Sequence, residues 1–377
     1  MNSPRNDGDP VKEIAGVMRL KEGEEAVRRV LTQIFRAGKI GTKDLAKAAR
    51  LPIPVTAAIR RELEKAGLVA RRGGAILTEK GSEYVTQTLG VTLGSQETET
   101  EIDQDLEVLE NLRKYSLKRP PASPELDQAH ATPETALKRV QYMQRRGDLD
   151  GRRLLFLGDD DLTSVAAGFL GTPREIGVID VDERLLELIG EASKTEGLGI
   201  ECVHHDLRDP LPESMLGRFD VFFTDPPYTV NGVKLFLSRG LQALRPRKVS
   251  NIYVAYADKP PLEMLELHRA ITDMGMYISE LTPGFNTYEG AEIFANTTSQ
   301  MRLTVTARSK PTITGTYSSH IYTGEAQPRM RVYRCKCGAD VLVGPKQRFS
   351  SINELKAIGC PHCGARAGFT LKKRVNL

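Results

Sequence analysis

Acidic residues follow four runs of apolar residues that have the composition of buried strands. In chain order they are the cluster Asp159, Asp160 and Asp161 and the single residues Asp180, Asp206 and Asp225. The first run, LLFL at 154–157, reaches its aspartates through Gly158, which suits a tight turn. In a parallel sheet the carboxyl ends of strands meet at one edge, where ligands bind. We therefore expect an acidic site at that edge, suited to cations and N–H donors.

The segment DPPY at 225–228 adds a second kind of amine-binding group. Because a residue before proline favours extended backbone, Asp225 should stay at the strand end. Pro226 stiffens the turn and leaves its carbonyl free to accept a hydrogen bond. Tyr228 offers a ring face and a hydroxyl. A carboxylate, a carbonyl and an aromatic wall together favour binding of an amine or a cation. A rigid surface turn is the alternative.

Asp180 and Asp206 stand where a nucleoside-binding sheet places acids. An acid ending the second strand commonly accepts hydrogen bonds from ribose hydroxyls, and Asp180 fits by position. Asp206, after the third strand, can meet the amino group of adenine, although it can also be a turn residue. Asp182 can instead cap the helix that begins near Glu183. In their order and spacing these acids resemble a class I S-adenosylmethionine-type domain.

Two amine-modifying reactions match this pattern. DPPY resembles the signature of amino methyltransferases acting on DNA or RNA, but three added aspartates would repel a phosphate backbone. An aminopropyltransferase instead uses decarboxylated S-adenosylmethionine and a polyamine, which are both cationic. A polyamine nitrogen attacks only when neutral, and deprotonation at pH 7 costs roughly 4 to 5 kcal/mol. A positioned carboxylate can accept that proton. A magnesium site or an acidic surface loop are alternatives for GDDD.

A separate set of four cysteines lies near the C-terminus, in CKCG at 335–338 and CPHCG at 360–364. Four thiolates suit tetrahedral Zn²⁺, and a glycine after each pair permits a tight turn. We expect residues 326–377 to form a zinc-ribbon-like segment with structural zinc, with His362 as a further candidate ligand. Reduced free thiols are the alternative. The predicted zinc ligands are Cys335, Cys337, Cys360 and Cys363.

The acids need a scaffold, and residues 127–325 have the pattern for one. Seven strand-like segments alternate with helical ones: RLLFLG, EIGVID, IECVHH, FDVFFTD, SNIYVAYA, MYISEL and QMRLTVTA. Such alternation predicts a parallel, doubly wound sheet of the Rossmann-like α/β class.

Residues 1–95 have the element order of a winged helix-turn-helix: three helices, then two strands turning at Gly73 and Gly74. The third helix carries Arg60, Arg61 and Lys65, which suits DNA, but acids interleave with them. We therefore expect this segment to serve dimerisation or to cover the site, with nucleic-acid binding possible but not favoured. Residues 96–126 follow as an acidic linker that becomes a helix, whose charges we expect to face solvent.

Composition sets further bounds. The 377 residues carry a formal charge of +4, which neither demands nor excludes nucleic acid. No apolar run approaches the roughly 18 to 20 residues of a membrane span. The first residues lack an apolar signal core, so we expect a cytoplasmic protein. Cys202, in an apolar strand, is expected in the core.

The chain resembles the branched-chain polyamine synthases, or N(4)-bis(aminopropyl)spermidine synthases. The resemblance runs over most of residues 24–300 and is carried by these motifs: DQAHATPET at 127–135, RRGDLDGRRLLFLGDDDLTS at 145–164, VIDVDERL at 178–185, HDLRDPLP at 205–212 and FDVFFTDPP at 219–227. It implies transfer of aminopropyl groups to the internal secondary nitrogen of spermidine, with release of 5′-methylthioadenosine. A homodimer is the expected assembly.

The resemblance also implies roles for individual residues. Asp159 is expected to activate the acceptor nitrogen, with Asp225 and Tyr228 lining the reaction centre. Asp160 and Asp161 would hold cationic groups, unless Asp161 caps the following helix. The other expected substrate contacts are Gly158, Asp180, Asp206 and Pro226, with Gln128 and Thr132 as weaker candidates. Thr132 can instead cap a helix before Pro133. The resemblance assigns no role to residues 284–296, where the residue types themselves make Tyr288, Glu289 and Glu292 candidates for an acidic acceptor tunnel, or for a solvated loop.

Overall fold

The computed structural model describes residues 9–20, 23–91, 99–246, 249–289, 297–323, 329–344, 347–349 and 352–376. The chain divides into two compact units. The first comprises Met1–Ala122, Ala129–Pro226 and Lys234–Tyr317. The second comprises Ser123–Gln128, Pro227–Val233 and Ser318–Leu377.

A seven-stranded sheet forms the centre of the first unit, in the order β5-β4-β3-β6-β7-β9-β8. The strands are β3 Arg153–Leu157, β4 Glu175–Asp180, β5 Ile200–His204, β6 Val221–Thr224, β7 Ser250–Tyr256, β8 Tyr277–Thr287 and β9 Thr297–Val305. The seven predicted strands are therefore present. The first five run parallel, so their carboxyl ends share one edge.

The predicted parallel arrangement is wrong for one strand. β9 pairs antiparallel with both of its neighbours, β7 and β8, so the sheet is mixed. The segment from β8 to β9, residues 288–296, is shorter than the dozen or more residues that a parallel crossover needs.

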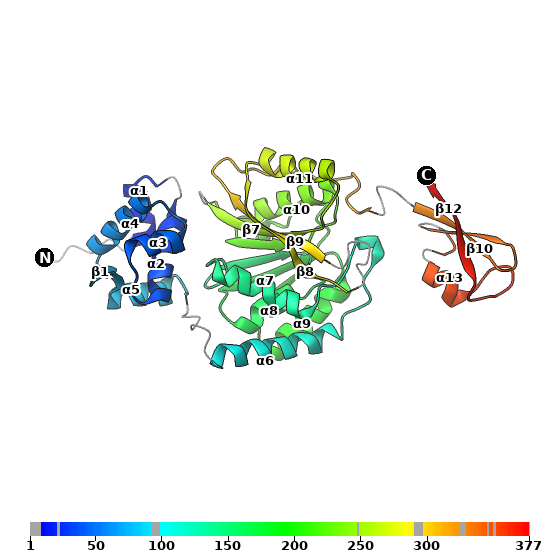
Figure 1. Cartoon of the computed structure of the whole chain (residues 1–377), viewed down its shortest axis with the longest axis horizontal. Coiled ribbons are helices and arrows are strands. Elements are labelled where there is room, and N and C mark those ends of the chain that lie inside the picture. Colours follow the sequence, from blue (N-terminus) through cyan, green and yellow to red (C-terminus); the bar gives the residue numbers. More distant parts are fainter. Residues whose placement is uncertain are drawn as a thin grey trace. The chain divides into compact units, whose positions relative to one another are not determined.

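Helices cover both faces of the sheet. Figure 1 shows α7, α8 and α9 on one side and α10 and α11 on the other. The helices are α6 Glu99–Ser116, α7 Pro133–Arg145, α8 Thr163–Leu170, α9 Glu183–Glu196, α10 Val230–Ala243 and α11 Pro261–Asp273. α6, predicted as a solvated linker helix, buries Val108, Leu112 and Tyr115 in the same core as α7 and α8. Its acids Glu107 and Glu110 remain exposed.

Residues 10–91 form the N-terminal helical segment, which has its own apolar core. Its elements are α1 Pro10–Val17, α2 Glu24–Ala37, α3 Thr42–Ala49, α4 Ile53–Lys65, β1 Val69–Arg71, β2 Ala75–Leu77 and α5 Glu79–Glu83. A buried ion pair joins this segment to the start of β3, with Arg152 Nη2 2.9 Å from Glu25 Oε1. The backbones of Gly90 and Gly151 approach so closely that a Cβ on Gly90 would lie 2.7 Å from Gly151 Cα.

The second unit contains a three-stranded antiparallel sheet in the order β11-β10-β12. Its strands are β10 Arg329–Cys335, β11 Asp340–Val343 and β12 Phe369–Asn376, accompanied by helix α13 Ile352–Ile358. Its small core includes Tyr333, Phe349 and Leu355, together with Cys335 and Cys360. Within the described parts of the chain, no helix is long and apolar enough to cross a membrane.

Candidate active site

The aspartates that follow β3, β4 and β6 converge because these three strands are neighbours in the sheet. Gly158 leaves β3 at φ 72°, a left-handed conformation that glycine adopts without strain. Asp160 lies within electrostatic reach of Asp159, Asp161, Asp180 and Asp225. The structure therefore brings five of the six predicted strand-end acids into one cluster.

The carboxylate of Asp159 accepts hydrogen bonds from neighbouring backbone amides. Its two carboxylate oxygens accept hydrogen bonds from the amides of Thr163 at 2.8 Å and Ser164 at 3.0 Å, at the start of α8. Its own N–H donates to Asp180 Oδ2 at 3.0 Å. Burial raises the pKa of Asp159 to about 7, against the lowering effect of the bonds at Ser164. Asp159 thus caps α8 and fixes the turn after β3.

Asp161 is held by a different set of partners. One carboxylate oxygen accepts from the backbone N–H of Ala131, and the other pairs with Arg139. The alternative prediction that Asp161 caps the following helix is wrong, because Asp159 takes that role.

Arg139 is the residue that the sequence analysis missed. Its side chain is completely buried, and Nη2 donates to Asp225 Oδ2 at 2.9 Å and to the Tyr288 hydroxyl at 2.8 Å. Nε donates to Asn286 Oδ1 at 2.9 Å. Burial opposes its charge, but Tyr288 and the two aspartates hold its pKa well above the usual value. Arg139 therefore ties α7 to the ends of β3, β6 and β8.

A sequence signal for Arg139 did exist. It lies three residues after Ala136 and four before Met143, on the face of α7 that enters the core. A charged residue on an apolar helix face is almost never buried without a partner. The periodicity therefore indicated a buried acidic partner, although it could not say which one.

Tyr288 completes the support of Asp225. Its hydroxyl donates to Asp225 Oδ2 at 2.5 Å and lies 3.0 Å from Thr298 Oγ1. The Asp225 side chain is 9% exposed, so it is not completely closed off from solvent. Tyr288 itself is buried. The solvated-loop alternative is therefore wrong for Tyr288, whose hydroxyl contacts Asp225.

Asp160 differs from its neighbours because no described residue donates a hydrogen bond to its carboxylate. It is half-buried, and burial together with the surrounding acids raises its pKa well above the usual range. Backbone amides hold Asp159 and Asp180, and Arg139 holds Asp161 and Asp225. Of the five clustered aspartates, Asp160 is thus the one for which no hydrogen bond from a described side chain or amide to the carboxylate is found.

Asp180 and Asp206, the two acids predicted to contact the nucleoside, differ in burial and in hydrogen-bond partners. Asp180 is buried, with Oδ1 accepting from Asp182 N at 2.8 Å and Oδ2 from Asp159 N. Asp182 caps α9 through Arg184 N at 3.2 Å, which confirms the alternative considered for it. Asp206 pairs with Arg208 at 2.8 Å, and these contacts lower its pKa although burial opposes them. Asp206 forms a turn contact here, with its side chain 31% exposed.

The remaining predicted contacts are spread more widely. Thr132 caps α7 by accepting from Thr135 N at 3.2 Å, so the capping alternative is confirmed. Gln128 and Tyr228 belong to the second unit, where Gln128 Oε1 accepts from Ser123 N at 2.7 Å. Pro226 is buried beside Asp225. Glu292 lies outside the described residues.

The four cysteines of the second unit meet as the sequence predicted. Their Sγ atoms all lie within 4.8 Å of one another. Cys335 and Cys363 Sγ are 3.6 Å apart and Cys337 and Cys360 Sγ 3.9 Å apart, which excludes disulfides. Four sulfurs bound tetrahedrally at about 2.3 Å would be about 3.8 Å apart. The donor set therefore fits Zn²⁺, and His362 is not part of it.

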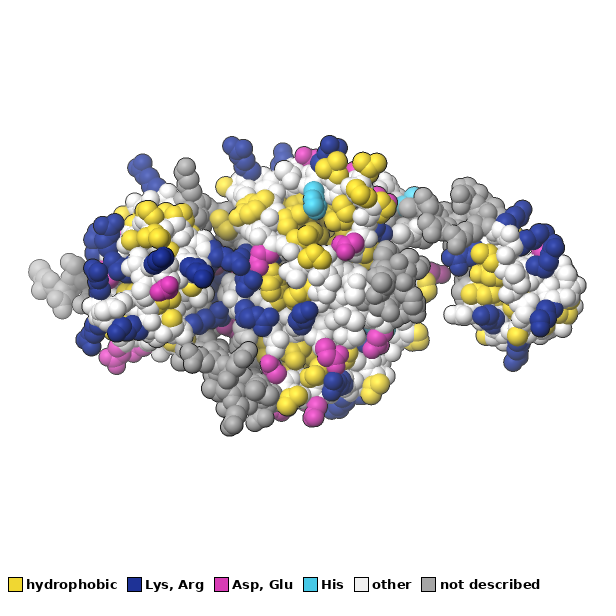
Figure 2. All heavy atoms as spheres, in the orientation of Figure 1, with side chains coloured by type: hydrophobic (Ala, Val, Ile, Leu, Met, Phe, Trp, Pro, Cys, Tyr) yellow, Lys and Arg dark blue, Asp and Glu magenta, His cyan; other side chains and the backbone are white. Residues whose placement is uncertain are grey.

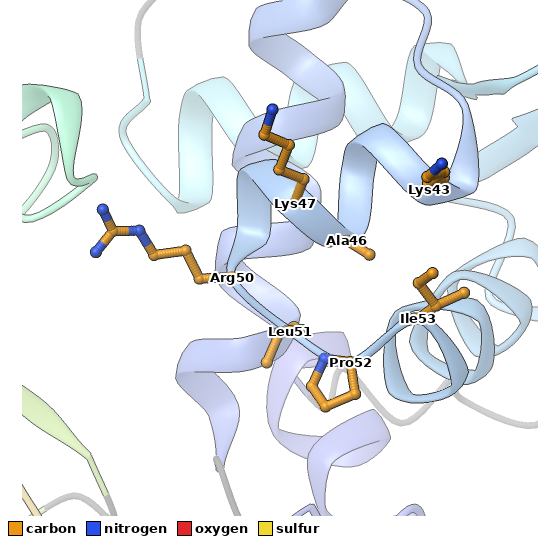
Figure 3. Close-up of a pocket in the computed structure, with 7 residues that line it drawn as sticks. All are labelled: Lys43, Ala46, Lys47, Arg50, Leu51, Pro52 and Ile53. Atoms are coloured by element: carbon orange, nitrogen blue, oxygen red, sulfur yellow. The ribbon is translucent and has the colours of Figure 1, made fainter.

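The N-terminal helical segment presents a cationic hollow, not an acidic one. Figure 3 shows this cavity of about 530 Å³, lined by Lys43, Ala46, Lys47, Arg50, Leu51, Pro52 and Ile53. Lys43, Lys47 and Arg50 point apart from one another (Figure 3), so they do not converge on one anion. Their charge also disfavours a polyamine.

Two of the three cations of α4, the helix considered for DNA contact, pair with acids. Arg60 of α4 is buried, lying 3.3 Å from Glu64 and donating to Thr42 Oγ1 at 3.0 Å. Lys65 pairs with Glu62 at 2.8 Å. Arg61 stays exposed. These pairs weaken the case for DNA recognition by α4, which depends on available cations.

Comparisons of the sequence with known proteins find similarity to one family. Residues 107–343 match the family model described as branched-chain polyamine synthase A C-terminal domain. An uncharacterised protein from Methanocaldococcus jannaschii is 41% identical over 368 residues, covering 95% of this chain and 91% of that protein. The N(4)-bis(aminopropyl)spermidine synthase from Thermococcus kodakarensis is 34% identical over 276 residues, covering 70% and 78%.

A solved structure extends the likeness to three dimensions. It is the branched-chain polyamine synthase from Thermus thermophilus in complex with N4-aminopropylspermidine and 5′-methylthioadenosine. The match has a TM-score of 0.54 at 26% identity and covers 84% of this chain and 98% of the other.

Proposed function

The chain belongs to the branched-chain polyamine synthase family, and from this premise we propose that it transfers aminopropyl groups from decarboxylated S-adenosylmethionine to the internal secondary amine of spermidine. The products are 5′-methylthioadenosine and a polyamine whose branch nitrogen becomes tertiary and then quaternary. The product-bound relative from Thermus thermophilus supports this assignment.

The observation that carries the proposal is the carboxylate cluster at the ends of β3, β4 and β6. Asp160 stands among four other aspartates, and Arg139 pairs with two of them. The donor carries a sulfonium and an amine, and the acceptor polyamine carries several amines. Each of these two cationic substrates would reduce the repulsion among the aspartates. A phosphate backbone would increase it, which disfavours an amino methyltransferase of DNA or RNA.

The reaction begins with proton removal from the internal secondary ammonium of spermidine. We assign the acceptor role to Asp160, because its carboxylate has no donor among the described residues and its raised pKa makes it a stronger base. Asp159, the residue first expected in this role, has both oxygens occupied by amides of α8. Asp159 would position the turn that presents Asp160.

The neutral nitrogen then attacks the aminopropyl carbon bound to the sulfonium. The new N–C bond forms as the C–S bond breaks, and the electron pair stays on sulfur as the neutral thioether of 5′-methylthioadenosine. The new tertiary ammonium must lose a proton before a second transfer. That second transfer gives a quaternary nitrogen, which carries no proton and keeps its charge.

Other residues support binding and orientation. Asp225 would hold a cationic group, with Tyr288 and Arg139 fixing its carboxylate. Asp161, tied to Arg139 and to Ala131, would contribute charge to the same pocket. Asp180 has lone pairs left for ribose hydroxyls. Asp206 would have to share its carboxylate between Arg208 and adenine. We keep the predicted substrate-contact roles of Gly158, Pro226, Gln128 and Glu292 and the predicted place of Tyr228 at the reaction centre, whereas Thr132 acts through α7.

The second unit and the N-terminal helical segment have supporting roles in the proposed function. Zn²⁺ bound by the four cysteines would hold the two turns of the second unit together. We propose that the N-terminal helical segment is a winged helix that serves dimerisation or covers the site. The paired cations of α4 support this over DNA recognition.

Assays of released 5′-methylthioadenosine, the product of aminopropyl transfer, and of S-adenosylhomocysteine, the product of methyl transfer, test the proposal. The protein is incubated with spermidine and decarboxylated S-adenosylmethionine, or with S-adenosylmethionine and DNA or RNA. Release should require the decarboxylated donor and spermidine. Turnover restricted to S-adenosylmethionine with nucleic acid would establish the methyltransferase alternative instead.

A further inference from the structure

Charge is divided very unevenly along this chain. Residues 329–377 contain eleven Lys and Arg against two Asp and Glu, a formal charge of +9. Since the whole chain carries +4, residues 1–328 carry −5. A Zn²⁺ ion held by four thiolates adds a net −2, so this C-terminal part keeps about +7. The acidic catalytic part is thus joined to a strongly basic one.

The basic side chains of this C-terminal part lie on its surface. The exposed ones in the described residues are Arg334, Lys336, Arg348, Lys356, Arg366, Lys372 and Lys373. Figure 2 shows Lys and Arg spread over the visible face of this part, with little acid among them.

Few of these cations are neutralised internally. Asp340 accepts both Arg334 at 2.8 Å and Lys372 at 2.5 Å. Lys336, Arg366 and Lys373 have no carboxylate partner among the described residues. Lys336 lies across the turn before β12, because a Cβ on Gly368 would fall 2.6 Å from its side-chain carbons. The first cysteine turn therefore brings a cation beside the strand that carries Lys372 and Lys373.

We propose that this C-terminal part binds nucleic acid through the phosphate backbone. A surface whose main feature is cations without counter-charges matches a polyanion that needs neither pockets nor base contacts. The inference concerns the second unit and does not depend on aminopropyl transfer.

Other anionic partners fit less well. A membrane surface calls for an amphipathic helix with a broad apolar face, but α13 has seven residues and buries Leu355. An acidic protein would be held by apolar or aromatic anchors in pockets. The large apolar side chains exposed in the described portion of this C-terminal part are Ile358 and Leu371.

The test measures binding of the full chain to a fluorescent single-stranded RNA of mixed sequence, a duplex DNA of equal length, and a poly-glutamate peptide of equal charge. Affinity for nucleic acid should fall by about 50-fold between about 50 and 200 mM salt if four phosphates of a single strand are contacted. The RNA and DNA arms decide which form is preferred. Poly-glutamate should bind at least tenfold more weakly.

Two matched sets of four substitutions locate the surface. The C-terminal set is Lys336→Gln, Arg366→Gln, Lys372→Gln and Lys373→Gln, and the control set is Lys43→Gln, Lys47→Gln, Arg71→Gln and Arg72→Gln. The first set should lower nucleic-acid affinity at least tenfold while zinc content and aminopropyl transfer stay unchanged. The control set should leave affinity within twofold.

Three results would overturn the inference. They are absence of binding at low salt, loss of affinity in the N-terminal set but not in the C-terminal set, and equal binding of poly-glutamate. The zinc content of the C-terminal set shows whether that part is still folded, so a loss of binding can be attributed to charge.

Discussion

Arg139 donates from Nη2 to Asp225 Oδ2 at 2.9 Å, and its side chain has no exposure to solvent. The same guanidinium pairs with Asp161 and contacts the Tyr288 hydroxyl. This arrangement joins GDDD to DPPY, two motifs that lie more than sixty residues apart in the sequence. The clustered aspartates outnumber the cation that pairs with two of them, and the guanidinium of Arg139 connects the two motifs.

Replacement of Arg139 should damage the site in a graded way. Arg139→Met removes the cation that pairs with two buried carboxylates and should destabilise the fold by about 3 to 5 kcal/mol. Arg139→Lys keeps the charge but cannot reach all of its partners. For Arg139→Lys we expect lower kcat/KM and an acidic limb of the pH–rate profile that moves to higher pH, since the carboxylates lose stabilisation. Arg113→Gln, in an exposed pair with Glu134, is the control. A wild-type pH profile in Arg139→Lys would contradict this role.

Replacement by asparagine should affect activity and stability differently at Asp160 and at Asp159. Asp160→Asn removes the proposed proton acceptor and should lower kcat/KM about 100-fold or more with little effect on stability. Asp159→Asn weakens the cap of α8 and should cost about 1 kcal/mol of stability, with a smaller loss of activity. Denaturant unfolding and steady-state kinetics on both variants check this. A folded, inactive Asp159→Asn beside an active Asp160→Asn would return the role to Asp159.

How far the sequence predicted this site depends on which contacts are local. The strand-end acids, the seven strands and the cysteine cluster follow from period, spacing and residue type within short windows. The partition of roles inside GDDD does not, because it depends on backbone amides of α8 and on an arginine from α7. The mixed sheet was missed for a similar reason, since the pairing of β9 is a long-range contact. Tyr288 was noticed as a candidate, but only the fold shows that its hydroxyl reaches Asp225.

Spermidine binding should strengthen as pH rises through neutrality. Burial raises the pKa of Asp159 to about 7 and raises that of Asp160 as well. A carboxyl with a raised folded-state pKa contributes stability below its unfolded pKa of about 4, and this contribution is lost as pH rises through the folded pKa. Spermidine favours the ionised carboxylates and so opposes that loss.

The corresponding measurement is the shift in melting temperature caused by spermidine. It should grow between about pH 5 and about pH 8, and Asp160→Asn should reduce it. Glu191→Gln, which alters an exposed pair with Lys118, should leave the shift unchanged. A spermidine effect of equal size at both ends of this range would contradict the assignment of ionised carboxylates.

Zinc should bind at one ion per chain and support the second unit. Cys363→Ser removes one of four clustered thiolates, so it should reduce bound zinc and increase proteolysis of residues 329–377. Cys202→Ser, a change in β5 outside the cluster, should keep the zinc. Metal analysis by mass spectrometry after dialysis measures the zinc that each variant retains. Equal zinc in the two variants, or no zinc in the unaltered protein, would remove this part of the account.

The structure of the product formed from spermidine and decarboxylated S-adenosylmethionine tests the central claim most directly. Tandem mass spectrometry and NMR locate the added aminopropyl group. Our account predicts addition at the internal nitrogen, first as a tertiary and then as a quaternary amine, with one 5′-methylthioadenosine released for each group. Extension at a terminal amine, or no product from protein that binds spermidine, would contradict it.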